Sequence, residues 1–104
     1  MIIQFNADRH LTVHEGFNDK LTDRLKKELN RFIEHITRLE VHLSDVNAEK
    51  KTANDKKCLI EARVKGKQPV AVTAFGDTHE LAVYGAAEKL KNSLDSIFGR
   101  MHSH

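Results

Sequence analysis

Residues 17–38 read FNDKLTDRLKKELNRFIEHITR, and this stretch carries two sets of residues at helical spacing. An α-helix turns by about 100° per residue, so side chains three and four positions apart share one face. The pattern predicts one helix that begins near His14 and continues to Arg38, with its apolar face on a core. The apolar set is Phe17, Leu21, Leu25, Leu29, Phe32 and Ile36.

The second set in this stretch is basic and lies roughly 120° round the same predicted helix. Mixed charge on a helix commonly means no more than a solvated surface. A cationic ridge about four turns long also suits a phosphate backbone, because lysine and arginine neutralise phosphates and release condensed counterions. The helix alone leaves both interpretations open. The basic set is Lys20, Arg24, Lys27, Arg31, His35 and Arg38.

Length and charge limit the class of protein. A chain of 104 residues fits a single domain, residues 1–104, with one core. The formal net charge is only +2, so any affinity for nucleic acid must come from local patches. Cys58 is the single cysteine and excludes an internal disulfide. No signal peptide is evident, and no apolar run approaches the roughly 20 residues that cross a bilayer. We therefore expect a cytoplasmic protein.

Alternation of apolar and polar residues predicts four strands, at residues 2–5, 39–44, 58–64 and 70–75. Lys65 to Gln68 form a turn, so the last two strands make an antiparallel hairpin. Gly76 ends the fourth strand, and Asp77 with Glu80 resembles a capping box that opens a final helix. The order β-α-β-β-β-α predicts an α+β fold in which both helices cover one face of a four-stranded sheet.

Further basic residues lie outside the first predicted helix. Residues 45–57 read as a long loop containing Lys50, Lys51, Lys56 and Lys57, which suits either a functional loop or a merely soluble one. On the final helix, Lys89 and Arg100 fall on the same angular side as the basic ridge of the first helix, and Lys91 falls on the other flank.

Signs of catalysis are weak. The sequence has no glycine-rich phosphate loop, metal-spaced Cys/His cluster or nucleophile elbow, and we expect no cofactor and no metal. Cys58 is expected to be a small buried hydrophobe. Glu40, His42 and Glu61 are expected on the open face of the sheet, where a hydrolase or metal-dependent enzyme is an alternative. The tail residues His102 and His104 suit a frayed end better than a metal site.

The element order, the length and a run in the final helix together resemble the ribosome hibernation promoting factor family, which includes ribosome-associated inhibitor A and the sigma-54 modulation or S30EA proteins. The similarity covers nearly the whole chain. Its most specific parts are Arg24 and Lys27 in the first helix and the strand that ends at Gly76. The final run comprises Asp77, Ala82, Val83, Lys89, Leu90 and Leu94.

This resemblance implies a bacterial cytoplasmic factor that binds the small ribosomal subunit in the channel used by mRNA and tRNA. Such factors block translation in stationary phase or stress. The family fold resembles a double-stranded-RNA-binding domain, with the basic edges of both helices turned toward rRNA. The chain looks like a short form without a carboxyl-terminal dimerisation domain, and we expect a monomer when it is free.

Together these observations predict an RNA-binding surface. A protein-interaction module, such as a modulator of a transcription factor, is the alternative, in which the apolar and acidic flanks matter more than the cations. The predicted RNA-binding residues are Lys20, Arg24, Lys27, Arg31, Arg38, Lys89, Arg100, Lys50, Lys51, Lys65 and Lys67.

Overall fold

The structure, a computed structural model, describes residues 1–7, 15–46 and 55–102, with Glu15 and residues 100–102 described by their backbone alone. Two α-helices, one short 3-10 helix and four strands follow the predicted order. Neither α-helix in this described part is long and apolar enough to cross a membrane. The elements are β1 (Ile2–Ala7), α1 (Glu15–Glu28), the 3-10 helix η1 (Asn30–Phe32), β2 (Ile36–Asp45), β3 (Lys56–Val64), β4 (Val70–Gly76) and α2 (His79–His102).

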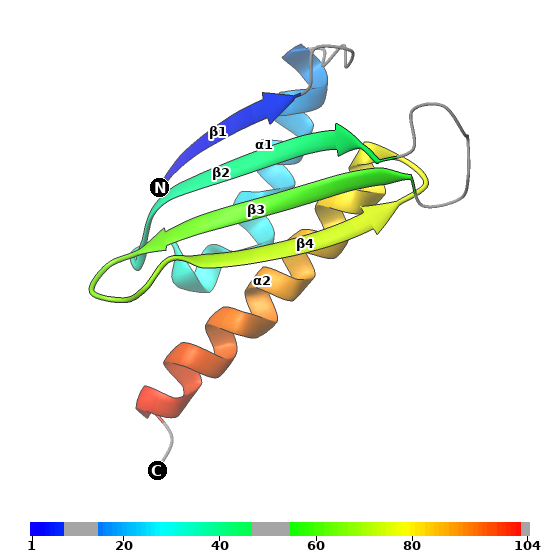
Figure 1. Cartoon of the computed structure of the whole chain (residues 1–104). Helices are drawn as coiled ribbons and strands as arrows, with labels where there is room; N and C mark the ends of the chain where they lie inside the picture. Colours follow the sequence, from blue (N-terminus) through cyan, green and yellow to red (C-terminus); the bar gives the residue numbers. More distant parts are fainter. Residues whose placement is uncertain (8–14, 47–54, 103–104) are drawn as a thin grey trace.

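The four strands form one sheet in the order β1-β2-β3-β4. β1 runs parallel to β2 because α1 carries the chain back between them, and the other two pairs are antiparallel. Both helices lie on the same face of this sheet (Figure 1). The predicted α+β fold, with two helices on one face of a four-stranded sheet, is confirmed.

Strand alternation puts every buried strand residue on the helix side. Val41 faces Ile60 in the register of β2 and β3, and Ile60 faces Val72 in β4. Cys58 lies in this inner layer with no exposed surface, as expected, and burial raises the pKa of its thiol to about 12. The helices and the turn after α1 complete the core with Leu21, Leu25, Leu29, Ala82, Val83, Ala86, Ala87, Leu90, Leu94 and Phe98.

The first helix is shorter than the sequence predicts. α1 ends at Glu28, a 3-10 turn follows, and β2 begins at Ile36, so the prediction of a helix that continues to Arg38 is wrong. Ile33, Ile36 and Thr37 are β-branched, and such residues lose side-chain freedom in a helix but fit a strand. Ile36 is still buried, because it faces Val64 across the sheet. Helical spacing identified a buried residue but assigned it to the wrong element.

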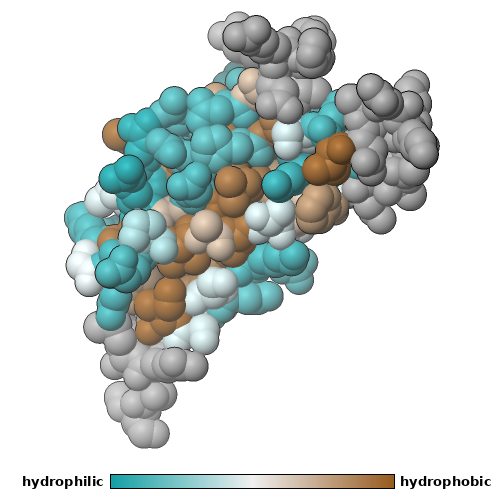
Figure 2. Space-filling view, viewed as in Figure 1, coloured by the Kyte–Doolittle hydropathy of each residue, from teal (hydrophilic) through white to brown (hydrophobic). Residues whose placement is uncertain are grey.

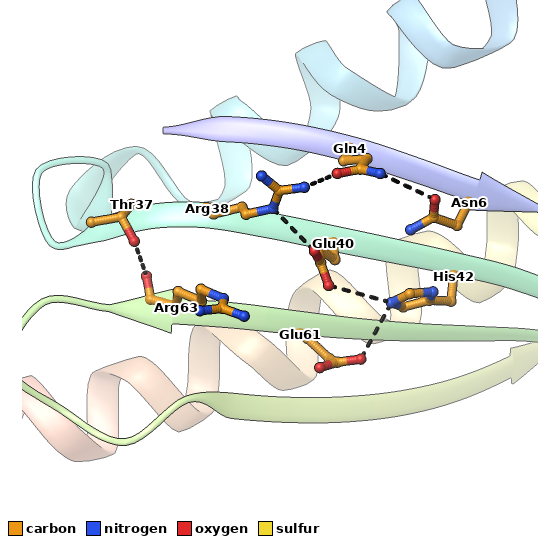
Figure 3. A network of polar contacts seen from close by, with 8 residues as sticks. All are labelled: Gln4, Asn6, Thr37, Arg38, Glu40, His42, Glu61 and Arg63. Carbon is orange, nitrogen blue, oxygen red and sulfur yellow. Dashed lines mark hydrogen bonds and ion pairs between the residues drawn. The ribbon is translucent and has the colours of Figure 1, made fainter.

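This boundary moves Arg38 to another surface. The register of β2 and β3 shifts between Ile36 and Arg38, and Arg38 then faces Arg63 on the side of the sheet away from the helices. Its guanidinium donates to Glu40 Oε1 over 3.0 Å and also to the side chain of Gln4 (Figure 3). Arg38 therefore cannot share a ridge with the cations of α1.

The predicted loop at residues 45–57 is also shorter, because Lys56 and Lys57 belong to β3. Lys56 Nζ lies 3.2 Å from Asp45 Oδ1 and 3.5 Å from Asp55 Oδ2. The Val46 amide donates to the Asp55 carbonyl over 2.9 Å. These contacts join the ends of β2 and β3, whereas Lys50 and Lys51 lie outside the described residues.

The start of α2 packs closely against the end of β4. The Leu81 amide donates to Thr78 Oγ1 over 3.1 Å, so Thr78 caps the helix with its hydroxyl. A Cβ added to Gly76 would lie 2.8 Å from the Ala82 nitrogen and 2.9 Å from Leu81 Cβ. Only glycine fits at Gly76 without displacing the first turn of α2.

We therefore expect Gly76→Ala to lower the free energy of unfolding by about 1–3 kcal/mol, the usual cost of forcing an extra methyl into a packed site. Urea denaturation followed by circular dichroism measures the change. Gly99→Ala is the matched control, because no atom lies within 4 Å of the added Cβ and alanine favours a helix. Equal stability of the Gly76 variant and the wild type would contradict the close packing.

Candidate nucleic-acid interface

α1 and α2 lie side by side and run in the same direction across the sheet (Figure 1). The start of α1 therefore lies beside the start of α2, and η1, which follows α1, lies beside a later part of α2. Lys20 Nζ lies 2.9 Å from Glu80 Oε1, and an Arg31 guanidinium nitrogen lies 2.9 Å from Asp95 Oδ1. We call the surface between the helices the helix seam; it comprises Lys20, Arg24, Lys27 and Arg31 on one side and Glu80, Tyr84, Lys91 and Asp95 on the other.

One end of the helix seam is organised by Glu80. Its carboxylate accepts a 2.6 Å hydrogen bond from the Tyr84 hydroxyl in addition to the contact with Lys20. The Tyr84 bond and then the Lys20 bond lower the pKa of Glu80, and the same contacts raise the pKa values of Tyr84 and Lys20. The Arg24 guanidinium lies 4.5 Å from the centre of the Tyr84 ring, a cation–π contact.

The other end of the helix seam combines a cation with aromatic rings. Arg31 is paired with Asp95, yet its side chain is 71% exposed, and its guanidinium lies 5.3 Å from the centre of the Phe32 ring. Phe98 stacks on Phe32 and on His35, with ring centres 5.9 and 4.3 Å apart. A hollow of about 180 Å³ is lined by Arg31, Phe32, His35, Phe98 and Gly99.

Between these ends, Lys27 and Lys91 have no charged partner among the residues that the structure describes. Lys91 shares a face of α2 with Glu80, Tyr84 and Asp95, because the spacings of four and seven return to the same side of a helix. The sequence prediction placed Lys91 on the other flank and missed it. The helix seam thus holds five cations against Glu80, Asp95 and the Glu28 carboxylate, which lies 3.8 Å from Arg24.

The remaining predicted residues lie elsewhere. Lys89 Nζ donates to the Thr73 carbonyl of β4 over 2.7 Å, on the side of α2 away from α1. Lys65 and Lys67 are exposed in the β3–β4 turn, where Gly66 takes a φ of 69°. The Lys65 amide donates to the His35 carbonyl over 2.9 Å, which brings this turn toward the Arg31 end. The side chain of Arg100 is not described.

The structure therefore brings four predicted cations together, namely Lys20, Arg24, Lys27 and Arg31, with the lysine turn beside them. Residues 4–102 of this chain match the model of a protein family that is described as "Sigma 54 modulation protein / S30EA ribosomal protein". The chain belongs to the S30EA family. The family predicted from the sequence is confirmed.

Solved structures of low sequence identity share the S30EA fold. The chain superposes on the crystal structure of the Thermus thermophilus Protein Y N-terminal domain with a TM-score of 0.72 and 18% identity, covering 93% of this chain and 99% of that one. A ribosomal subunit interface protein from Coxiella burnetii gives a TM-score of 0.72 and 17% identity, with coverages of 95% and 99%. A search of curated proteins finds no match.

The Glu80 contacts predict how the stability of this S30EA domain depends on pH. The pKa of Glu80 is lowered from its ordinary 4.5 in the folded state. Its contribution is therefore complete above the unfolded pKa and is lost as the pH falls through the folded pKa. Between about pH 6 and pH 3, wild type should lose more stability than Glu80→Gln, measured as urea midpoints.

Tyr84→Phe is the matched control for this experiment. It keeps the carboxylate and removes the hydrogen bond that lowers the Glu80 pKa most. The acid-dependent loss of stability should then be intermediate between those of wild type and Glu80→Gln. Identical pH profiles for all three proteins would show that Glu80 has the same pKa in the folded and unfolded states.

Proposed function

We propose that this chain is a ribosome hibernation factor. It binds rRNA of the small ribosomal subunit in the channel for mRNA and tRNA, and it blocks translation in stationary phase or stress. The observation that carries the proposal is the sorting of Lys20, Arg24 and Lys27 onto one flank of α1, continued by Arg31 in η1, beside α2. Membership of the S30EA family supports it.

The cations of the helix seam are accessible to a phosphate. The side chains of Lys20, Arg24 and Arg31 are 59%, 49% and 71% exposed although each has a carboxylate nearby. Ion pairs this exposed contribute little to stability because solvent screens them, so exchanging Glu80 or Asp95 for an RNA phosphate costs little. The existing pairs orient these long side chains along the helix seam before RNA arrives.

The middle of the helix seam supplies the unopposed charge. Lys27 and Lys91 have no carboxylate partner among the described residues, so they attract RNA without first releasing an internal contact. Phosphate contacts of this kind need no base recognition, because structured RNA is read largely by its shape. We include Lys65 and Lys67 in the proposed contact surface, because the Lys65 amide donates to the carbonyl of His35, near the Arg31 end.

The proposal also covers catalysis, oligomeric state and cellular location. Binding and steric blocking need neither a cofactor nor a chemical step, so we propose a non-enzymatic protein that acts as a monomer in the cytoplasm. Arg38 and Lys89 lie away from the helix seam and are left out of the proposed contact surface. Lys50, Lys51 and Arg100 stay predictions from the sequence.

The test is a pair of charge reversals. Arg24→Glu with Lys27→Glu should abolish co-sedimentation with small subunits at moderate salt, because four units of charge change on the proposed contact surface. At low salt, where residual binding can be measured, the slope of log K against log salt concentration should fall by about 2, one unit for each lost phosphate contact. Inhibition of cell-free translation should fall in parallel.

Lys57→Glu with Arg63→Glu is the matched control. It changes the charge equally, but both residues lie on the sheet face away from the helices. We expect this control to bind ribosomes at least ten times more tightly than the helix variant. Full binding by the helix variant would contradict the proposal, because the helix seam would then not contribute to binding. Equal losses of binding in both variants would also contradict it, because net charge rather than the helix seam would then determine the affinity for ribosomes.

A further inference from the structure

The open face of the sheet carries a cluster that RNA binding does not use. Glu40 and His42 alternate along β2, and Glu61 lies directly opposite Glu40 on β3. His42 Nε2 is 3.2 Å from Glu61 Oε1 and 3.9 Å from Glu40 Oε2 (Figure 3). The two-residue period of a strand puts all three side chains on one face, so the cluster follows from the register.

The surroundings of the cluster are polar on one side. Figure 2 shows hydrophilic residues gathered over the β1 and β2 part of the open face, with hydrophobic residues beside them toward β4. The side chains of Glu40, His42 and Glu61 are 27%, 36% and 46% exposed. The three side chains are therefore partly exposed on this face, although the His42 Nε2 atom itself is buried among them.

The negative charge of the two carboxylates in the cluster is compensated only in part. Like charges directly opposite each other in a sheet are destabilising, and Glu40 faces Glu61 in this way. Arg38 compensates part of this charge, but its Nε contacts only Oε1 of Glu40. The Glu40 Oε2 atom stays directed toward His42.

His42 does not compensate the Glu40–Glu61 pair through a hydrogen bond. Its Nε2 atom has no exposed surface and no hydrogen bond of acceptable geometry, although both carboxylates are near. With Nε2 unprotonated, this nitrogen and one oxygen of each carboxylate offer three lone pairs close to one another. A cation bound among them would satisfy all three.

We propose that Glu40, His42 and Glu61 bind a divalent transition-metal ion, with Zn²⁺ as the best fit. The three donor atoms lie within 4.8 Å of one another. Zinc ligands at about 2.0–2.2 Å from the metal lie roughly 3.0–3.5 Å apart. The 3.2 Å between His42 Nε2 and Glu61 Oε1 already fits, and the Glu40 carboxylate has to move toward these two donors.

The donor set selects the type of ion. Imidazole nitrogen favours zinc and its neighbours, whereas Ca²⁺ and Mg²⁺ prefer oxygen ligands alone. Three protein donors on an exposed face leave the remaining positions to water. The ion neutralises the Glu40–Glu61 pair and links β2 to β3.

Isothermal titration of the full chain with Zn²⁺, after treatment with a chelator, tests the site near neutral pH. Wild type should bind one equivalent at this site, and both Glu61→Gln and His42→Ala should bind it at least about tenfold more weakly. Glu34→Gln makes the same chemical change on an exposed carboxylate outside the cluster and should bind like wild type.

Thermal unfolding provides the second readout. Zn²⁺ at about a hundred times its Kd should raise the Tm of wild type by about 10–20 °C, because the ion binds the folded chain. Without metal, Glu61→Gln should be at least as stable as wild type, since the like-charge pair is gone, and the same Zn²⁺ concentration should raise its Tm by no more than about half as much as that of wild type. This control shows that the variant folds.

Two results overturn the proposal. One is the absence of Zn²⁺ binding by wild type. The other is unchanged affinity in both Glu61→Gln and His42→Ala, which assigns the ion to other residues such as His102 and His104. The outcome is independent of ribosome binding, because the cluster and the helix seam lie on opposite sides of the sheet.

Discussion

The structure depends on one constraint: both helices must bury their apolar faces against the same side of a single sheet. Leu21 and Leu25 of α1, and Leu90 and Leu94 of α2, are fully buried there. A layer packed on one side only leaves two surfaces polar, the outer flanks of the helices and the far face of the sheet. Among the described residues, the helix seam and the Glu40–His42–Glu61 cluster lie on these two surfaces.

Much of the fold is readable in the sequence because one face of each strand is buried. Val41, Ile60 and Val72 alternate with polar neighbours, and the predicted strands hold them in one layer. The end of α1 was not readable, because Phe32 and Ile36 keep helical spacing although a 3-10 turn and a strand bury them. Periodicity reports which residues are buried, and it cannot tell which element buries them when two elements meet.

The candidate site was predictable in part for a similar reason. Lys20, Arg24 and Lys27 lie on one continuous helix, so their common flank follows from geometry alone. The role of Lys91 depends on where α1 packs relative to α2, which no local pattern contains. The contact of Arg31 with Asp95 joins residues 64 positions apart, and only the folded chain brings them together.

Lys89 has a consequence for the outer edge of the sheet. β4 is a terminal strand of the sheet that the structure describes, and a terminal strand offers backbone groups on which another chain can pair. Lys89 donates to one carbonyl of β4, that of Thr73, and places a positive charge beside this strand. A second chain that paired with β4 there would have to displace this contact or meet the charge of Lys89. The position of one residue of α2 thus disfavours edge-to-edge pairing at β4.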